Sequence, residues 1–301
     1  MSSDTLPPSK HEGSVPTVGL WVVAISFTTL SIVHSLFPTS GLIFSLFYFL
    51  VLPLVFSFWH GARRYGVVGI VIFFLVSEIV GNFMENISIA TGLPFGNYHY
   101  TFNGIPFLFQ VPLTIGLAYF AYGYLAWTIG NILLEKADEH LNEWFSTIAL
   151  PIVSSFIMVM WDVVMDPINS TIHHMWIWQN GGGYNGVPLT NYLGWLLTVY
   201  LFFQLFALYQ RTRRAKLVTD VSISYWYQPL LLYFFTALSY IIGFAVAGNG
   251  VIADATGHLW RKHDIYETAA IVSLYTMVFP SVLAFVILLK NKKRELGTKR
   301  S

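Results

Sequence analysis

The chain has 301 residues, of which 55% are hydrophobic and only 10% are charged, and its formal net charge is +1. A globular domain carries roughly 25% charged residues, so this composition excludes an ordinary water-soluble protein and indicates an integral membrane protein. The absence of cysteine excludes disulfides, thiolate metal ligands and thiol nucleophiles.

Apolar runs of about 20 residues are long enough to cross a bilayer as helices, and they predict an all-α protein with about eight transmembrane helices. In chain order the predicted spans are 17–37, 41–59, 67–90, 106–131, 145–165, 189–209, 230–248 and 268–290. We therefore expect a cytoplasmic tail over 1–16, one transmembrane helical domain over 17–290 and a basic cytoplasmic tail over 291–301. No cleavage-type signal follows the polar start, so the first span is expected to be retained.

The basic residues test this count, because eight spans place both termini on one side of the membrane. Fourteen of the sixteen Lys and Arg fall on the terminal side, and only Arg261 and Lys262 fall in the opposite loops. The positive-inside rule therefore predicts that both termini are cytoplasmic. The expected location is a plasma membrane of the bacterial inner or archaeal kind. The basic C-terminus is expected to contact anionic lipid headgroups rather than nucleic acid.

Three loops are predicted on the outward side, at 91–105, 166–188 and 249–267. The first two contain no Lys or Arg and are rich in Gly, Pro, Asn, Tyr, Trp and His. Loops of this length commonly fold back over a cavity. The alternative is that their aromatic residues only mark the membrane interface, where Trp and Tyr are common.

A short repeat links two parts of the chain. The tetrapeptide Val-Pro-Leu-Thr occurs at 111–114 and again at 187–190, each time after an outward loop. Glu85 precedes the first copy by 26 residues, and Asp162 precedes the second by 25. This spacing predicts an internal parallel repeat of acid helix, loop and partner helix.

Four acidic residues lie within or at the edge of predicted spans: Glu78, Glu85, Asp162 and Asp166. Burying a carboxylate in hydrocarbon costs roughly 2.5–3.5 kcal/mol, and apart from Lys290 at the terminal edge of the last span the spans contain no Lys or Arg to pair with it. We therefore expect these groups to face an interior cavity, with at least one protonated at neutral pH. For Asp166 an interfacial cap, and for Glu78 a polar packing contact, remain open alternatives.

One block of sequence runs from Glu85 to Pro112 and a second from Trp161 to Trp195, and the two together resemble the CruF-like carotenoid biosynthesis family of membrane proteins. In the first, Glu85 is followed by Thr-Gly-Leu-Pro-Phe-Gly-Asn-Tyr-His-Tyr at 91–100 and by Val-Pro at 111–112. The second runs from Trp161-Asp162 and Asp166-Pro167 through Trp176, Trp178 and Gly183-Tyr184 to Gly194-Trp195. The resemblance covers roughly residues 67–210. It implies a carotenoid hydratase, which adds water across a terminal double bond of an acyclic carotenoid such as a lycopene derivative or a C50 bacterioruberin precursor.

Hydration of an isoprenoid alkene requires an acid that protonates carbon, a shell that tolerates a tertiary carbocation, and a positioned water molecule. Glu85 and Asp162 are the predicted acid and base, in either order. Glu78 and Asp166 are the other two catalytic candidates. The predicted cation shell comprises Trp161, Trp176, Trp178, Tyr98 and Tyr100, whose rings can face positive charge. Asn82, His99 and Asn191 are predicted to orient the water. No cofactor is expected, because hydration changes no oxidation state.

Other functions remain open at this stage. A membrane terpenoid or carotenoid cyclase or isomerase would use the same acid and aromatic shell, and a proton-coupled transporter would use the acids as a relay. The nine histidines do not form the closely spaced clusters of iron-binding membrane enzymes, so no metal site is expected. The expected partners are the bilayer, a lipophilic isoprenoid substrate and other enzymes of carotenoid synthesis.

Overall fold

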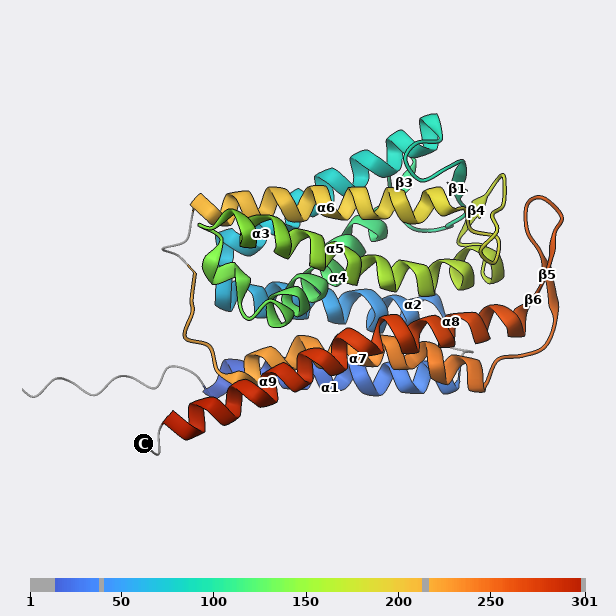
Figure 1. The fold of residues 1–301 in the computed structure, drawn as a ribbon. Helices are drawn as coiled ribbons and strands as arrows, with labels where there is room; N and C mark the ends of the chain where they lie inside the picture. The colour runs from blue at the N-terminus through green and yellow to red at the C-terminus, as the bar shows by residue number, and fades with distance from the viewer. Residues whose placement is uncertain (1–13, 38–40, 213–216, 299–301) are drawn as a thin grey trace, which may run out of the picture.

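The structure is a computed structural model that describes residues 14–37, 41–212 and 217–298. It is a bundle of long helices (Figure 1). The helices are α1 (Ser14–Leu36), α2 (Leu42–Leu46), α3 (Leu52–Thr91), α4 (Leu113–Leu133), α5 (Trp144–Asp166), α6 (Leu189–Thr212), α7 (Ile223–Ala245), α8 (Lys262–Thr276) and α9 (Val278–Thr298). Between them lie the π-helices η1 (Phe47–Val51) and η3 (Pro167–Ile172), the 3-10 helix η2 (Ala137–His140), and the strands β1 (Tyr98–Tyr100), β2 (Phe107–Leu108), β3 (Val111–Pro112), β4 (Trp176–Trp178), β5 (Val251–Ala253) and β6 (Leu259–Arg261).

Helix α3 is two helices joined at Gly66, where the backbone leaves the helical conformation with φ 70° and ψ 166°. A straight helix would place Phe58 and Phe74 about 24 Å apart. Their ring centroids are instead 5.2 Å apart, so the chain reverses direction at Gly66. Glycine adopts this positive φ without a steric penalty. The second arm of α3 corresponds to the predicted span 67–90, and α2, η1 and the first arm together correspond to the predicted span 41–59.

Six helices are long and apolar enough to cross a membrane, and α3 with its reversal counts as one of them. They run over Val18–Leu36, Phe44–Thr91, Trp144–Ile172, Leu189–Thr212, Ile223–Ala245 and Lys262–Lys293. Helix α4 is not among the six, and it begins seven residues later than the predicted span, because residues 106–112 form strands β2 and β3. The predicted number of eight spans and the division into one domain with two tails therefore stay predictions.

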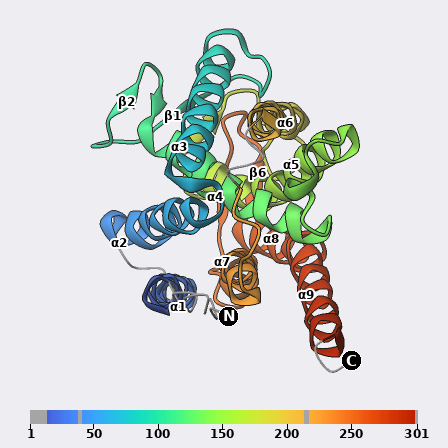
Figure 2. The ribbon, with the colours of Figure 1, turned by 90° about the vertical axis from the view of Figure 1, so that its left-hand side faces the viewer.

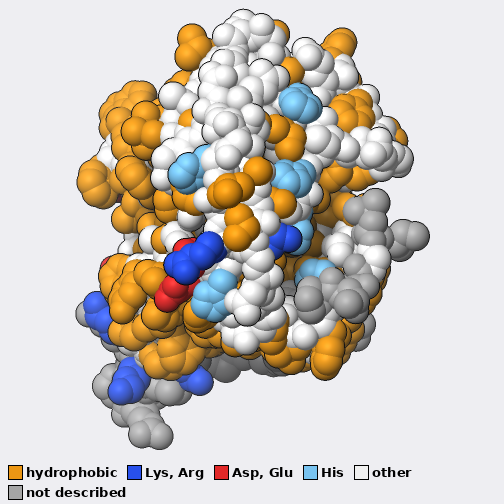
Figure 3. Space-filling model, turned by 90° about the vertical axis from the view of Figure 1, so that its right-hand side faces the viewer, with side chains coloured by type: hydrophobic (Ala, Val, Ile, Leu, Met, Phe, Trp, Pro, Cys, Tyr) orange, Lys and Arg blue, Asp and Glu red, His pale blue; other side chains and the backbone are white. Residues whose placement is uncertain are grey.

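The bundle has two distinct ends. Helix α1 begins and helix α9 ends on the same side, which we call the terminal end (Figure 1). The opposite side, the loop end, carries the connections of all three predicted outward loops. Charged side chains are sparse on the loop-end face (Figure 3). This distribution agrees with the charge asymmetry read from the sequence, while the cytoplasmic location of the termini stays a prediction.

A buried ion pair closes the terminal end. Arg64 donates from Nε and Nη2 to the two carboxylate oxygens of Asp138, each at 2.6 Å, and both residues are almost fully buried. Tyr65 also donates to Asp138, and Trp127 donates to the Tyr65 hydroxyl. Arg64 further donates to the carbonyl oxygen of Val218. Every charge in this cluster therefore has its counter-charge or hydrogen-bond partner.

The two copies of the Val-Pro-Leu-Thr motif occupy similar places in the fold. Each precedes a long helix at the loop end, α4 after the first copy and α6 after the second. The two preceding loops pair through one strand each, since β1 and β4 form an antiparallel sheet. The internal parallel repeat itself stays a prediction.

Candidate active site

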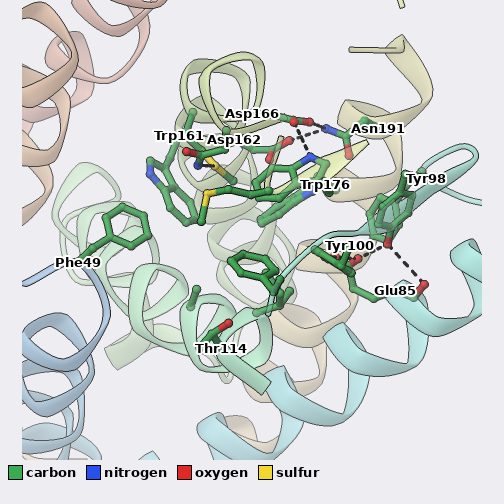
Figure 4. A pocket seen from close by; sticks show the side chains of 18 of the residues that line it. Phe49, Glu85, Tyr98, Tyr100, Thr114, Trp161, Asp162, Asp166, Trp176 and Asn191 are labelled. Carbon is green, nitrogen blue, oxygen red and sulfur yellow. Dashed lines mark hydrogen bonds between the residues drawn. The ribbon is translucent and has the colours of Figure 1, made fainter. Parts of the chain in front are cut away.

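A cavity of about 100 Å³ lies near the loop end, beneath the β1–β4 sheet (Figure 4). Its wall is mostly apolar and aromatic, and it includes three carboxyl groups, from Glu85, Asp162 and Asp166. The wall is built by η1, the second arm of α3, α4, α5 and α6, together with the two strands. Segments far apart in the sequence therefore meet around one small space.

Glu85 lies at one side of this cavity and is held by three tyrosines. Tyr119 donates to its Oε1 at 2.8 Å, and Tyr100 and Tyr98 both donate to Oε2, Tyr100 at 2.9 Å. Glu85 is only 3% exposed. Burial, and after it the nearby Glu85 carboxyl, raise the pKa of Tyr98 and of Tyr100 well above the usual value. Both phenols therefore stay protonated and remain donors at neutral pH.

Asp162 and Asp166 are the other two carboxyl groups of the cavity, and the side-chain amide of Asn191 bridges them. The Asn191 side-chain NH₂ donates to Oδ2 of Asp162 at 3.0 Å and to Oδ2 of Asp166 at 2.6 Å. Positions i and i+4 of helix α5 bring the two aspartates onto one face. The remaining oxygen of Asp162, Oδ1, is buried and has no hydrogen-bond partner within the described chain.

Asp166 is the more firmly held of the two aspartates. Its Oδ1 accepts hydrogen bonds from the indole N–H groups of Trp176 at 2.8 Å and Trp178 at 3.3 Å. The helix loosens directly after Asp166 into the π-helix η3, which begins at Pro167. Hydrogen bonds to both oxygens of Asp166 therefore fix its position. One oxygen of Asp162 has no hydrogen-bond partner among the described residues.

The short β1–β4 sheet explains why loop residues reach the cavity. Tyr98 pairs with Trp178 and Tyr100 with Trp176 in an antiparallel register. Because side chains alternate along a strand, these four rings face the interior, and His99 between them faces outward. His99 is exposed, and its Nδ1 lies 3.4 Å from the Gln179 side-chain amide.

The other side of the cavity is an aromatic group around Trp161. Its ring stacks on Tyr122 with centroids 4.1 Å apart, and Phe49 and Trp195 lie at 6.0 and 6.2 Å. Phe49 comes from the π-helix η1, and its carbonyl oxygen accepts a hydrogen bond from Tyr122 at 2.8 Å. The rings therefore have fixed positions beside the Asp162 carboxyl.

The structure gathers most of the sequence-predicted site residues and separates a few from them. The cavity wall includes Glu85, Asp162, Asp166, Tyr98, Tyr100, Trp161, Trp176, Trp178 and Asn191. Glu78 and Asn82 lie outside it, hydrogen-bonded to each other at 3.1 Å against Gly116 of α4. Glu78 and Glu85 therefore occupy separate surroundings although both lie on α3. His99 also lies outside the cavity.

Two residues were missed by the sequence reasoning. Tyr119 supplies one of the three hydrogen bonds to Glu85, and its ring stacks on Trp195 at 4.5 Å. Helix α4 is apolar on all sides and almost wholly buried, so no periodic pattern singles out one tyrosine among its aromatic residues. Trp195 lies within the resemblance, at Gly194-Trp195, but carries no chemical signal of its own.

Charge balance distinguishes this cavity from the rest of the protein. Among the described residues, no ion pair includes Glu85, Asp162 or Asp166. Three carboxyl groups therefore share an apolar space without a pairing cation. The only described group of His, Asp and Glu with metal-ligand spacing is elsewhere, at His263, Asp264 and Glu267 on the loop end. Asp264 is already paired with Arg261 at 2.7 Å.

The fold and the cavity define a helical protein of the multi-pass membrane type with a buried acidic and aromatic site. Within this class, residues 41–256 match the family of carotenoid biosynthesis proteins, which is more than two thirds of the chain. The chain belongs to this family. Every residue of the cavity wall lies within the matched segment. Searches of curated proteins and of solved structures gave no match.

Proposed function

We propose that the protein is a carotenoid hydratase, which adds water to a terminal double bond of an acyclic carotenoid. One observation carries the proposal: Glu85 and Asp162, from separate helices, line one apolar cavity, and neither is paired with a cation among the residues that the structure describes. Two carboxyl groups in different surroundings make a suitable acid and base pair. Membership in the carotenoid biosynthesis family supports the substrate class.

Asp162 is the proposed acid. Its Oδ1 has no hydrogen-bond partner in the described part of the chain, and Asp166 lies next to it through the shared Asn191 amide. Two neighbouring carboxyl groups do not both ionise readily, so the pair favours one shared proton. Trp176 and Trp178 donate to Asp166 and so favour it as the ionised member. The proton then resides on Asp162.

Glu85 is the proposed base. Three phenol O–H groups donate to its two oxygens, and donors of this kind stabilise a carboxylate. In the reaction, the Asp162 O–H bond breaks and its proton forms the new C–H bond at the less substituted alkene carbon. Water then attacks the tertiary cation through oxygen and releases a proton to Glu85. Proton exchange between the carboxyl groups through water restores the starting state.

The aromatic wall supports the cationic step. Trp161, Trp176 and Trp178 line the cavity beside the aspartates. Each ring face contributes roughly 0.5–2 kcal/mol to the stabilisation of a nearby cation. A carotenoid dissolves in the bilayer, so its end group is proposed to reach the cavity from the lipid, with water arriving from the loop end. Other carotenoid-synthesising enzymes in the same plasma membrane would supply the substrate.

The test uses membranes that contain the protein and ¹⁸O-labelled water. An acyclic carotenoid of the lycopene type and one of the C50 type are supplied in separate reactions. Hydration predicts a tertiary alcohol that retains the label, with membranes lacking the protein as control. A product of unchanged mass would instead indicate a cyclase or isomerase, which uses the same acid but excludes water. Unchanged carotenoids of both the lycopene and C50 types would contradict the proposal.

A further inference from the structure

Strands β2 and β3 form a small hairpin beside the cavity. Phe107 pairs with Pro112 and Leu108 with Val111, and the Leu113 N–H donates to the carbonyl oxygen of Pro106 at 2.9 Å. The chain leaves the cavity wall at Phe102 and returns to it at Thr114. The hairpin is therefore the outer part of a segment whose two ends both line the cavity. It projects sideways from the bundle (Figure 2).

The tip of this hairpin is apolar and exposed. Phe107 is 40% exposed, Leu108 42% and Phe109 85%. Three consecutive exposed apolar residues are unfavourable in water. The segment between Glu85 and Glu135 contains no charged residue, so no charge would have to leave water if the hairpin entered lipid.

The backbone at the tip also disfavours an aromatic residue there. Phe109 has φ 57°, in the left-handed region that turns usually fill with Gly or Asn. A non-glycine residue in this conformation costs about 1–2 kcal/mol. The sequence places phenylalanine at this position despite the strain. A favourable contact of the exposed Phe109 ring is the simplest way to offset this backbone cost.

Hydrogen bonds set the depth of the hairpin. Asn86 of α3 accepts from the Gln110 N–H at 3.0 Å and donates to the carbonyl oxygen of Leu108. Asn86 lies five residues before the end of α3 at Thr91, or roughly 8 Å along the helix axis. Apolar groups of interfacial segments reach roughly 5–10 Å into the headgroup and acyl boundary. The hairpin thus lies beside the helix and not beyond its end.

The hairpin continues the lipid-facing side of α3. Ile79, Phe83 and Ile87 are exposed at i, i+4 and i+8, with exposed fractions of 67%, 61% and 36%. These spacings form one apolar stripe along the helix. The stripe ends next to Asn86, where the hairpin is attached. Phe107, Leu108 and Phe109 extend the same surface at the loop end.

We propose that the β2–β3 hairpin is an interfacial anchor, whose tip residues Phe107, Leu108 and Phe109 insert into the outward-facing leaflet of the bilayer. The occupant of this surface is lipid. The anchor holds Phe102 and Thr114, the two ends of this segment in the cavity wall, at the membrane, whichever reaction the cavity performs. The inference does not depend on the hydratase activity.

Because the chain has no cysteine, single-cysteine spin labels test the proposal directly. Phe109→Cys is labelled in the full-length protein in phosphatidylcholine–phosphatidylglycerol vesicles. Collisions of the label with oxygen, which concentrates in lipid, are compared with collisions with a water-soluble nickel chelate. Phe83→Cys is the lipid reference. Ala255→Cys is the water reference, since it lies exposed at the tip of the β5–β6 hairpin beyond the bundle (Figure 1).

We expect the oxygen-to-nickel ratio at Phe109→Cys to exceed that at Ala255→Cys several-fold and to approach that at Phe83→Cys. A ratio equal to that of Ala255→Cys would overturn the proposal. If Phe109→Cys does not yield folded protein, Leu108→Cys gives the same comparison. Turnover of a carotenoid is not part of this readout, so loss of the proposed function leaves the result interpretable.

Discussion

Two groups of buried carboxyls lie at opposite ends of the bundle and have opposite neighbours. At the terminal end, Asp138 accepts hydrogen bonds from two guanidinium nitrogens of Arg64 and from the Tyr65 hydroxyl, so its negative charge is balanced. At the loop end, Glu85 accepts hydrogen bonds from three phenols, and Asp162 accepts one from an amide. Among the described residues, neither carboxyl is paired with a cation. A paired carboxylate fixes the helices that carry it. A carboxyl group without a pairing cation can still bind and release a proton.

The difference also appears in hydrogen-bond satisfaction. Both oxygens of Asp138 have partners, whereas Oδ1 of Asp162 is buried without one. A buried polar atom without a partner calls for a specific explanation. Oε1 of Glu78 is also buried without a partner among the described residues, but of these two carboxyls only that of Asp162 lines the cavity. The explanation proposed here is that Asp162 meets its partner in the reaction. The following predictions test this contrast, from the largest expected effect to the smallest.

The loop-end carboxyls should control turnover without controlling the fold. We expect Asp162→Asn and Glu85→Gln each to lower the rate of product formation by roughly 10²–10⁴-fold, the usual contribution of a positioned acid or base. The isosteric amides keep the packing, so the thermal unfolding temperature in detergent should change little. The checks are product quantification and a melting curve on the same preparations. Near-normal turnover of either variant would remove that residue from the mechanism.

The terminal-end pair should behave in the opposite way. Asp138→Asn removes the buried counter-charge of Arg64 and leaves only the partly exposed Glu139 beside it, which is expected to cost about 3–5 kcal/mol of stability. Thermal unfolding should therefore occur at a clearly lower temperature, and turnover per folded molecule should be unchanged. Glu139→Gln is the matched control, because Glu139 is partly exposed and its pairing with Arg64 should contribute only about 0–1 kcal/mol.

A smaller effect is expected where one hydrogen bond to Glu85 is removed. Tyr119→Phe keeps the stacked ring and deletes one donor, and a hydrogen bond to a charged group contributes about 1.5–3 kcal/mol. Turnover should fall about tenfold or more. Tyr122→Phe is the control, since its hydroxyl binds only the Phe49 carbonyl. Equal losses in both variants would show that turnover falls with the loss of any buried hydroxyl and not with the loss of the bond to Glu85.

The smallest effect is expected at Glu78. Its carboxyl lies outside the cavity and is bonded to Asn82. Glu78→Gln should change turnover by less than roughly twofold, as for other substitutions away from a functional centre. A loss as large as that of Glu85→Gln would place Glu78 in the reaction, as the sequence reasoning allowed. Both variants are compared at equal amounts of folded protein.

Much of the helical architecture follows from local sequence properties. The predicted span 145–165 agrees closely with α5 and the span 189–209 with α6. The gap between 41–59 and 67–90 coincides with the reversal at Gly66. The span 106–131 began too early, because Pro106 to Pro112 is apolar enough for a helix but forms a hairpin. Hydropathy does not distinguish these two conformations.

The candidate site was predictable in its chemistry and only partly in its members. Acids without cations within apolar runs indicated Glu85, Asp162 and Asp166, and loop aromatics indicated Tyr98 and Trp176. Tyr119 gave no signal, because every face of α4 is apolar and buried. Glu78 and Glu85 have similar sequence surroundings, at i and i+7 on one helix. Only the neighbouring elements separate them, since Glu78 faces Gly116 and Glu85 faces the three tyrosines.

The sequence by itself determined the membrane class, the basic terminal side, the unpaired acids and the two blocks of family resemblance. These are properties of composition and of residues close together along the chain. The tertiary structure alone decided that Glu85 and Asp162 share one cavity, that β1 pairs with β4, and that Tyr119 completes the Glu85 site. Convergence depends on which helix faces and strands meet, and hydropathy records how deeply a residue is buried but not which residue it meets.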